Sequence, residues 1–412
     1  MKKALLALGL LSFSVWAGVT LTNQQDRGWQ GKRGTSNVGA PHATEAACWT
    51  AMRADAEARK LSANYTCANT KAARLEYAAA PVVVPPVVVP PVVVPPAGDP
   101  HQGGMHSGSM PWYNPATIPP PAVGRSTRLE GPAGEAPRAA DGNGAFRTRC
   151  QASHWNRDDS LLYPGRIGAA HLHLYWGNTN SDANSTLNGL LTSGNSTCRG
   201  GIMNRSTYWI PALIDTSDRH VLQPGEIFVY YKRGYAGTTN EQIQPPPVGI
   251  QMIAGDMRRM DPFAAAWQAR HYFECQGGNR AGTRDTEIPQ NCTGELIVNL
   301  TFPQCWDGRN LTAPDHMSHM TYPNAPNGCP ASHPVALPEV SYTVHFPIPA
   351  GRNTSNWRLS SDNYTGGRGG RSMHGDWRNG WDHATSVQWT REIINQGRDS
   401  SGHLGNGRQA LD

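Results

Sequence analysis

Apolar and polar residues alternate along three segments in the second half of the chain. This two-residue period is typical of a β-strand with one buried face. The segments are residues 227–232, residues 296–302 with Leu296, Val298, Leu300 and Phe302 on one face, and residues 340–346 with Val340, Tyr342, Val344 and Phe346 on one face. Pro-, Gly- and Asn-rich stretches separate them. We therefore predict a mainly β main domain over residues 146–395, an antiparallel β-sandwich or jelly roll with long loops.

The first third of the chain has other patterns. Residues 1–17 combine a basic start, an apolar run and small residues at the end, which predicts a cleaved signal peptide. Residues 18–79 predict a small α+β module with a strand at 19–22, a helix over 44–61 and a second strand near 65–77. Residues 80–145 begin with three Val-Val-Val-Pro-Pro repeats, which favour an extended polyproline II spacer.

We expect residues 80–145 to be a linker throughout, and the Gly-, Ser- and Arg-rich residues 396–412 to be a disordered tail. Two His and two Met between residues 101 and 110 could hold a soft metal such as copper. A linker that happens to contain these residues is the alternative.

Composition and charge narrow the class of protein to which this chain can belong. Gly and Pro, at 44 and 33 residues, exclude a helical bundle, and a net charge of +5 is too small to indicate a nucleic-acid partner. The apolar run in residues 4–16 is shorter than the roughly 20 residues of a membrane span. We therefore expect a secreted or periplasmic protein with no membrane span and no nucleic-acid partner.

All eight cysteines follow the predicted signal peptide. An even number of cysteines in an exported chain indicates disulfide bonds. Cys48 and Cys67 are the only two in the N-terminal module, and we expect them to pair with each other. The other six allow 15 pairings, among which the sequence does not choose.

The segment from His171 to Trp176 holds the first candidate site. On a strand, Leu172, Leu174 and Trp176 would point to one face and His171, His173 and Tyr175 to the other. Two histidines in this spacing can converge on one ion, so we predict His171 and His173 as ligands of a divalent transition metal, Zn²⁺ or copper. Histidines hydrogen-bonded to neighbours without a metal are the alternative.

Two further His/Asp clusters occur in the main domain. One contains His316 and His319 after Asp315, and the other contains His374 and Asp376. If the three clusters meet, they form a metal site or an acid/base set in which a carboxylate orients a histidine. We therefore name six candidate catalytic residues: His171, His173, His316, His319, His374 and Asp376. Capping or turn roles for the aspartates are the alternative.

Aromatic residues lie beside these polar motifs, as they do where proteins hold sugar rings. The candidate substrate-binding residues are Trp176, Trp306, Trp377, Trp381 and Asp382. Core packing of the same tryptophans is the alternative. The adjacent carboxylates of Asp158 and Asp159 would diverge on a strand, so we do not expect both to serve one site.

The ordered series of motifs resembles a known family. Its members share Ser153-His154-Trp155, Asp158-Asp159, His171-Leu172-His173, Cys305-Trp306-Asp307-Gly308 and His374-Gly375-Asp376 as they stand here. Residues from about 150 to 389 resemble domain of unknown function 1996, with Leu174-Tyr175-Trp176 in place of an expected Thr and two Phe. The resemblance implies a secreted protein of a kind often joined to wall-associated or carbohydrate-binding modules, and it leaves the reaction open.

Two hypotheses follow. The first is a secreted protein that binds or cleaves extracellular polysaccharide, as a hydrolase or lyase, through a groove lined with His, Asp and Trp. The second is a non-catalytic metal-binding or wall-associated structural protein in which the same histidines hold an ion or the fold.

Overall fold

The computed structural model describes residues 112–255, 270–278, 281–362 and 368–412, together with short elements before residue 112. The chain divides into two compact units, residues 1–95 and 96–412. No helix in the described part of the chain combines the length and the apolar composition that a membrane span needs.

The first unit contains a five-stranded antiparallel sheet. Its strands are β1 (Val19–Thr22), β2 (Gly31–Arg33), β3 (Ser36–Asn37), β4 (Ala63–Cys67) and β5 (Lys71–Tyr77), in the order β1-β5-β4-β2-β3. The strand expected at residues 19–22 is present, and the region near 65–77 forms a hairpin of two strands. The signal peptide, the Cys48–Cys67 bond, the Val-Pro spacer and the His/Met tract lie outside the described residues, as does all but one residue of the expected helix over 44–61.

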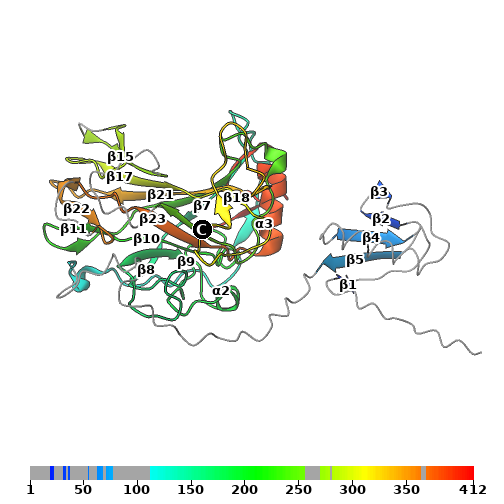
Figure 1. Ribbon diagram of the computed structural model, residues 1–412, viewed down its shortest axis with the longest axis horizontal. Helices are drawn as coiled ribbons and strands as arrows, with labels where there is room; N and C mark the ends of the chain where they lie inside the picture. The colour runs from blue at the N-terminus through cyan, green and yellow to red at the C-terminus, as the bar shows by residue number, and fades with distance from the viewer. Residues whose placement is uncertain are drawn as a thin grey trace, which may run out of the picture. The chain divides into compact units, whose positions relative to one another are not determined.

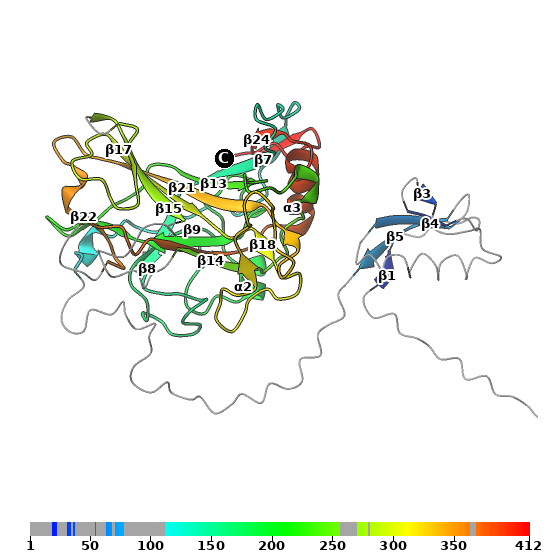
Figure 2. The same ribbon diagram turned by 45° about the horizontal axis from the view of Figure 1, so that its top comes forward.

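The second unit is mainly β, as the sequence predicts, and two large sheets form its sandwich (Figures 1 and 2). The first sheet has five strands in the order β14-β23-β10-β9-β8. They are β8 (Ala152–Asn156), β9 (His173–Gly177), β10 (Thr207–Pro211), β14 (Gln251–Gly255) and β23 (His374–Arg378). All of their pairings are antiparallel.

The second sheet has seven strands in the order β16-β15-β17-β21-β13-β7-β24. They are β7 (Ala145–Cys150), β13 (Ile227–Lys232), β15 (His271–Gln276), β16 (Arg284–Asp285), β17 (Glu295–Thr301), β21 (Glu339–Pro347) and β24 (Asp399–Ser401). The predicted apolar faces of β17 and β21 are buried throughout. The alternation in the sequence is therefore confirmed where one face of a strand meets the core.

The core lies between the two sheets and is rich in aromatic side chains. Trp176 of β9 meets the ring of Tyr342 of β21 edge-on, with centroids 4.8 Å apart. The hydroxyls of Tyr208 and Tyr231, one from each sheet, lie 2.7 Å apart, so the buried tyrosines satisfy each other. Most of the tryptophans in the polar motifs are thus part of this core.

Short sheets and helices close the ends of the sandwich. The short strands are β6 (Glu130–Pro132), β11 (Leu213–Asp215), β12 (His220–Val221), β18 (Cys305–Trp306), β19 (Met320–Thr321), β20 (Val335–Ala336), β22 (Trp357–Leu359) and β25 (Arg408–Ala410). The helices are α2 (Leu187–Thr192) and α3 (His383–Trp389), and α3 continues as a π-helical turn at Thr390–Ile394. Short 3₁₀ turns occur at Pro115–Thr117, Asn240–Gln242 and Thr354–Asn356.

Three disulfides brace the second unit. They join Cys150 to Cys198, Cys275 to Cys292 and Cys305 to Cys329. These bonds are one of the 15 pairings that the sequence left open.

Both ends of the second unit extend further than the sequence predicts. The segment after Gln396 is not disordered: β24 pairs with β7, β25 pairs with β6, and Asp412 forms ion pairs with Arg149 and Arg199. Since β6 lies inside the predicted linker, the end of that linker also belongs to the domain. Composition does not reveal this order, because β24 and β25 are three-residue strands in a Gly- and Ser-rich segment and owe their order to backbone pairing with distant strands.

Candidate metal centre

The site residues lie on the face of the five-stranded sheet that points away from the sandwich core. Trp209 of β10 pairs with Tyr175 of β9 on one side and with Asp376 of β23 on the other, so these three side chains share a face. His173 lies two residues before Tyr175, and His374 lies two residues before Asp376. Both histidines therefore reach the same face, at the same end of their strands.

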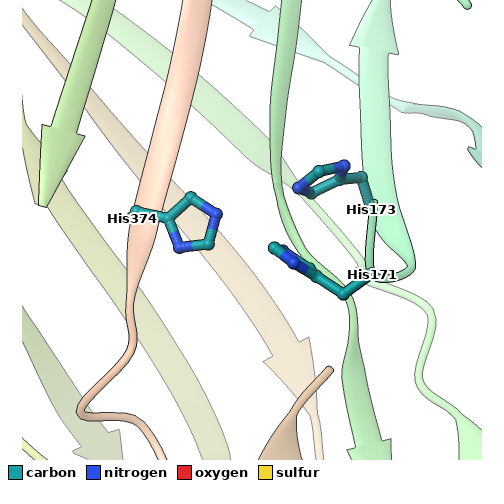
Figure 3. A group of neighbouring side chains, drawn as sticks. All are labelled: His171, His173 and His374. Carbon is teal, nitrogen blue, oxygen red and sulfur yellow. The ribbon is translucent and has the colours of Figure 1, made fainter. Parts of the chain in front are cut away.

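Three histidines converge at this end of the sheet. His171 precedes β9, His173 begins it and His374 begins β23, and Figure 3 shows the three rings facing one another. One nitrogen from each residue lies within 4.8 Å of the other two. The ring centroids are 4.2 Å apart for His171 and His173, 5.0 Å for His171 and His374, and 6.0 Å for His173 and His374.

Backbone carbonyls orient two of the imidazoles. Nδ1 of His173 donates to the carbonyl oxygen of Asp158 at 2.9 Å, and Nδ1 of His374 donates to that of Ser372 at 2.8 Å. This assignment leaves the Nε2 lone pair of each ring for the cluster. A backbone or carboxylate acceptor on the second ring nitrogen is the arrangement that metal-binding histidines nearly always show.

The cluster contains buried nitrogen atoms that the protein does not satisfy. Nε2 of His171 and Nε2 of His173 are buried and have no hydrogen-bond partner in the part of the chain that the structure describes. Burial lowers the pKa of His171 well below its usual value and that of His173 to about 3, with the neighbouring histidines adding to both shifts. These rings are therefore neutral near pH 7, the form that binds a metal without first losing a proton.

Two carboxyl groups lie along the same face of the sheet. Asp376 is fully buried, and burial together with the charge of Asp159 raises its pKa well above the usual value. Burial also raises the pKa of Asp159 to about 6, although its Oδ1 accepts the backbone N–H groups of Leu161 and Leu162 at 2.8 Å. Asp376 thus lies two residues after His374 in the sequence, but the charge that acts on its carboxyl group is that of Asp159.

The loop between β8 and β9, residues 157–172, covers this face. Oδ1 of Asp158 accepts the N–H of Gly168 at 2.8 Å, which ties the start of the loop to its far end. The carbonyl of Asp158 also accepts the hydroxyl of Tyr175 at 2.6 Å, beside its bond to His173. One residue therefore fixes both the loop and a histidine of the cluster.

Two glycines let β23 come close to its neighbours. A Cβ on Gly375 would lie 2.5 Å from Cδ2 of Leu300 in the opposite sheet. A Cβ on Gly255 would lie 2.2 Å from the carbonyl oxygen of Met373 and 2.7 Å from Cα of His374. Only glycine fits at Gly255, where the close atoms belong to the backbone and φ is +82°, whereas a methyl group at Gly375 would have to displace the side chain of Leu300. Both glycines therefore help to place His374.

The structure does not bring all six predicted catalytic residues together. His319 donates from Nε2 to the carbonyl of Gln251, at the start of β14, whereas His374 pairs with Gly255 at its end. Four residues of strand separate these points by about 13 Å. His316 lies in the same loop as His319, which follows β18, so the expectation of one site shared by all three clusters is wrong.

The expected substrate-binding tryptophans are mostly in the core. Trp176, Trp377 and Trp381 have no exposed surface, so they do not stack on a sugar, and the expectation for them is corrected. Both faces of β9 and β23 are covered, which alternation along the sequence does not reveal. Trp306 is partly exposed and donates to the carbonyl of Asn310, and Asp382 caps α3 through Thr385.

The charge interaction between Asp159 and Asp376 does not follow from the sequence. The adjacent pair Asp158-Asp159 was visible, and the expectation that the two carboxylates diverge agrees with their separate partners. The partner of Asp159 lies 217 residues away, on β23, and no local pattern marks it.

Fold and site together define a class: a disulfide-braced antiparallel β-sandwich with three histidines clustered at one end of a sheet. The family comparison identifies it more closely. The model of the Domain of unknown function (DUF1996) family matches residues 159–381, more than half of the chain, and the protein belongs to that family. No curated protein matches the chain, and no solved structure does.

Proposed function

We propose that this protein binds a transition-metal ion, Zn²⁺ or copper, through His171, His173 and His374. The observation that carries the proposal is the convergence of one nitrogen from each histidine within 4.8 Å. Bonds of about 2.0–2.1 Å from a tetrahedral ion would place the nitrogens about 3.3 Å apart, so modest side-chain rotation completes the site. Hydrogen bonds from Nδ1 of His173 and His374 to backbone carbonyls support this assignment.

The donor set favours these metals. Three imidazoles suit Zn²⁺ and copper, whereas Mg²⁺ and Ca²⁺ prefer oxygen ligands. No fourth His, Cys, Asp or Glu joins the group among residues 112–255, 270–278, 281–362 and 368–412. Three protein ligands with an open position are typical of catalytic zinc sites, in which water or substrate takes the fourth place. A metal-dependent reaction is therefore the form of catalysis that we propose for this site.

Metal analysis tests the proposal. The full chain, purified without chelating resins, is loaded with Zn²⁺ or Cu²⁺, dialysed and assayed for bound metal. We expect one ion per chain, and a loss of affinity of at least about 10–100-fold in His171→Gln, since outer-shell changes alone cost that much. His171 is the variant of choice because it is partly exposed and precedes β9, so the fold survives its loss.

The control variant is His220→Ala, which removes an exposed histidine of β12. It keeps the metal content of the wild type if the cluster is the site. An equal metal content in His171→Gln and in the wild type would reject the proposal.

We further propose that the protein works outside the cytoplasm. Three disulfides among the described residues support an oxidising compartment. Fractionation of the source cells tests this, with the protein expected in the medium or the periplasm and contradicted by a cytoplasmic pool with reduced thiols.

A further inference from the structure

A second hollow, separate from the three histidines, lies beside the loop that follows β9. Its volume is about 610 Å³, within the range of about 300–1,000 Å³ in which proteins hold small ligands. The floor is formed by His154 and Trp155 of β8, and the wall by residues 178–193, which include α2. We call it the Asn/Ser cavity, after the residues of this wall.

The lining has a distinct chemistry. Asparagine amides and serine and threonine hydroxyls supply most of its polar groups, and Trp155 and Pro121 supply apolar surface. Asp182 is its single acidic residue, and no Lys or Arg lines it. Burial lowers the pKa of His154, so this ring is neutral near pH 7. The cavity therefore has no cation to pair with a phosphate, a sulfate or a uronic acid, and the carboxylate of Asp182 repels them, so it suits a neutral ligand with many hydroxyl groups.

The loop uses one part of its polar groups for its own fold. The amide of Asn178 donates to the carbonyls of Leu190 and Ser193, at 3.1 and 3.0 Å. Oδ1 of Asp182 accepts the N–H of Asn184 at 2.8 Å and the hydroxyl of Ser185 at 3.3 Å. These bonds give the wall a fixed shape before any ligand arrives, which lowers the entropy cost of binding.

Another part of the polar groups is left over. Asn180 and Asn184 both line the cavity with exposed side chains, and neither amide takes part in a hydrogen bond within the described residues. Each amide offers two donors and an acceptor, which is the complement of vicinal hydroxyls.

We propose that the Asn/Ser cavity binds a neutral saccharide, with the amides of Asn180 and Asn184 hydrogen-bonded to its hydroxyl groups. This inference adds a ligand class to the proposed function and uses none of the three histidines. The cavity also lies close to them. The ring of His154 stacks on Tyr175 at 4.8 Å, and Tyr175 meets His173 at 6.0 Å.

Calorimetric titration tests the inference. The full chain is titrated with neutral tetrasaccharides built on glucose, xylose, mannose or N-acetylglucosamine, and with tetragalacturonate as the acidic counterpart. We expect at least one neutral sugar to bind with a Kd below about 1 mM. Asn180→Ala combined with Asn184→Ala should weaken it about 10- to 30-fold, since two hydrogen bonds to the ligand are lost.

Asn188→Ala serves as the control, because Asn188 is an exposed residue of α2 that does not line the cavity. It should bind as the wild type does, and thermal melts of all variants report on the fold. The saccharide site is rejected if no neutral sugar binds at about 10 mM, if the double variant binds like the wild type, or if tetragalacturonate binds as tightly as the neutral sugars.

The same titration separates this inference from the metal proposal. Metal-free wild type and His171→Gln should bind the sugar with unchanged affinity, since the cavity contains no ligand of the proposed ion. If the chain binds a neutral sugar but no metal ion, the saccharide proposal is supported and the metal proposal is rejected. If it binds a metal ion but no sugar, the metal proposal is supported and the saccharide proposal is rejected.

Discussion

At the scale of the residue, His173 shows how this fold prepares a ligand. Its side chain has no exposed surface, so an unpaired polar nitrogen is costly there. The carbonyl of Asp158 satisfies Nδ1, while Nε2 has no hydrogen-bond partner among the described residues. A buried group left in this state needs an explanation, and a metal ion shared with His171 and His374 supplies one.

Gly375 gives the most direct residue-scale test of how β23 is positioned. Gly375→Ala would place a methyl group 2.5 Å from the side chain of Leu300 and 3.1 Å from the carbonyl of Trp209. We expect a loss of about 1–3 kcal/mol of unfolding free energy, as for other overpacked cores, measured by denaturant titration. Gly134→Ala is the control, because nothing lies within 4 Å of its added methyl group. Equal stability of the two variants would contradict this packing.

Sequence patterns predicted the residues of the site only in part. His171 and His173 stand out because a strand places alternate residues on one face. His374 was a candidate for acid/base chemistry, and its position in the cluster follows from the strand order β23-β10-β9, which joins segments about 200 residues apart. The separation of His316 and His319 from the cluster is equally a matter of strand register, whereas the charge interaction of Asp159 with Asp376 depends on how the loop after β8 folds over the sheet.

At the scale of the element, the loop between β8 and β9 covers the sheet face that carries the three-histidine cluster. It is attached through Asp158, whose Oδ1 accepts the N–H of Gly168 and whose carbonyl accepts Nδ1 of His173. The loop and the histidine cluster therefore share one anchor.

Asp158→Ala tests this link. The substitution removes the bond to Gly168 and leaves all three histidines in place, so the loop and the Asp158 carbonyl lose their fixed position. We expect the metal affinity to fall about 10-fold, within the range for outer-shell changes, in a competition assay with a chromophoric chelator. Asp218→Ala, at an exposed position of the turn after β11, should leave the affinity unchanged. An unaltered affinity in Asp158→Ala would show that the loop does not position the ligands.

Element prediction from the sequence succeeded where one face of a strand is buried. The alternating faces of β13, β17 and β21 are examples, because solvent on the other side keeps the alternate positions more polar. The prediction that Trp176 and Trp377 are exposed failed, since a strand covered on both faces has no contrast between apolar and polar alternate positions. Element prediction failed also for β24 and β25, three-residue strands whose order comes from pairing with β7 and β6.

At the scale of the whole molecule, disulfides add stability to a domain that is built from two large sheets and several small ones. Cys150–Cys198 closes a loop of 48 residues, and Cys275–Cys292 closes one of 17. The chain-entropy relation predicts stabilisation of about 4 kcal/mol for the first and about 3 kcal/mol for the second.

Variants in which both cysteines of one disulfide are replaced by alanine test which of the two bonds stabilises the domain more. We expect the variant lacking Cys150–Cys198 to unfold at the lower denaturant concentration of the two, in equilibrium unfolding of the second unit under non-reducing conditions. The reverse order, or no loss in either variant, would contradict a role of loop closure in the stability of this domain.

The central claim is that His171, His173 and His374 hold one metal ion, and X-ray absorption at the edge of the bound metal tests it most directly. For Zn²⁺ or copper in the wild type, we expect about three nitrogen ligands at 2.0–2.1 Å with the outer-shell scattering of imidazole rings. We also expect that His171→Gln loses one imidazole from that spectrum or loses the metal altogether. A metal bound without imidazole scattering, or a spectrum that is the same in both proteins, would contradict the account.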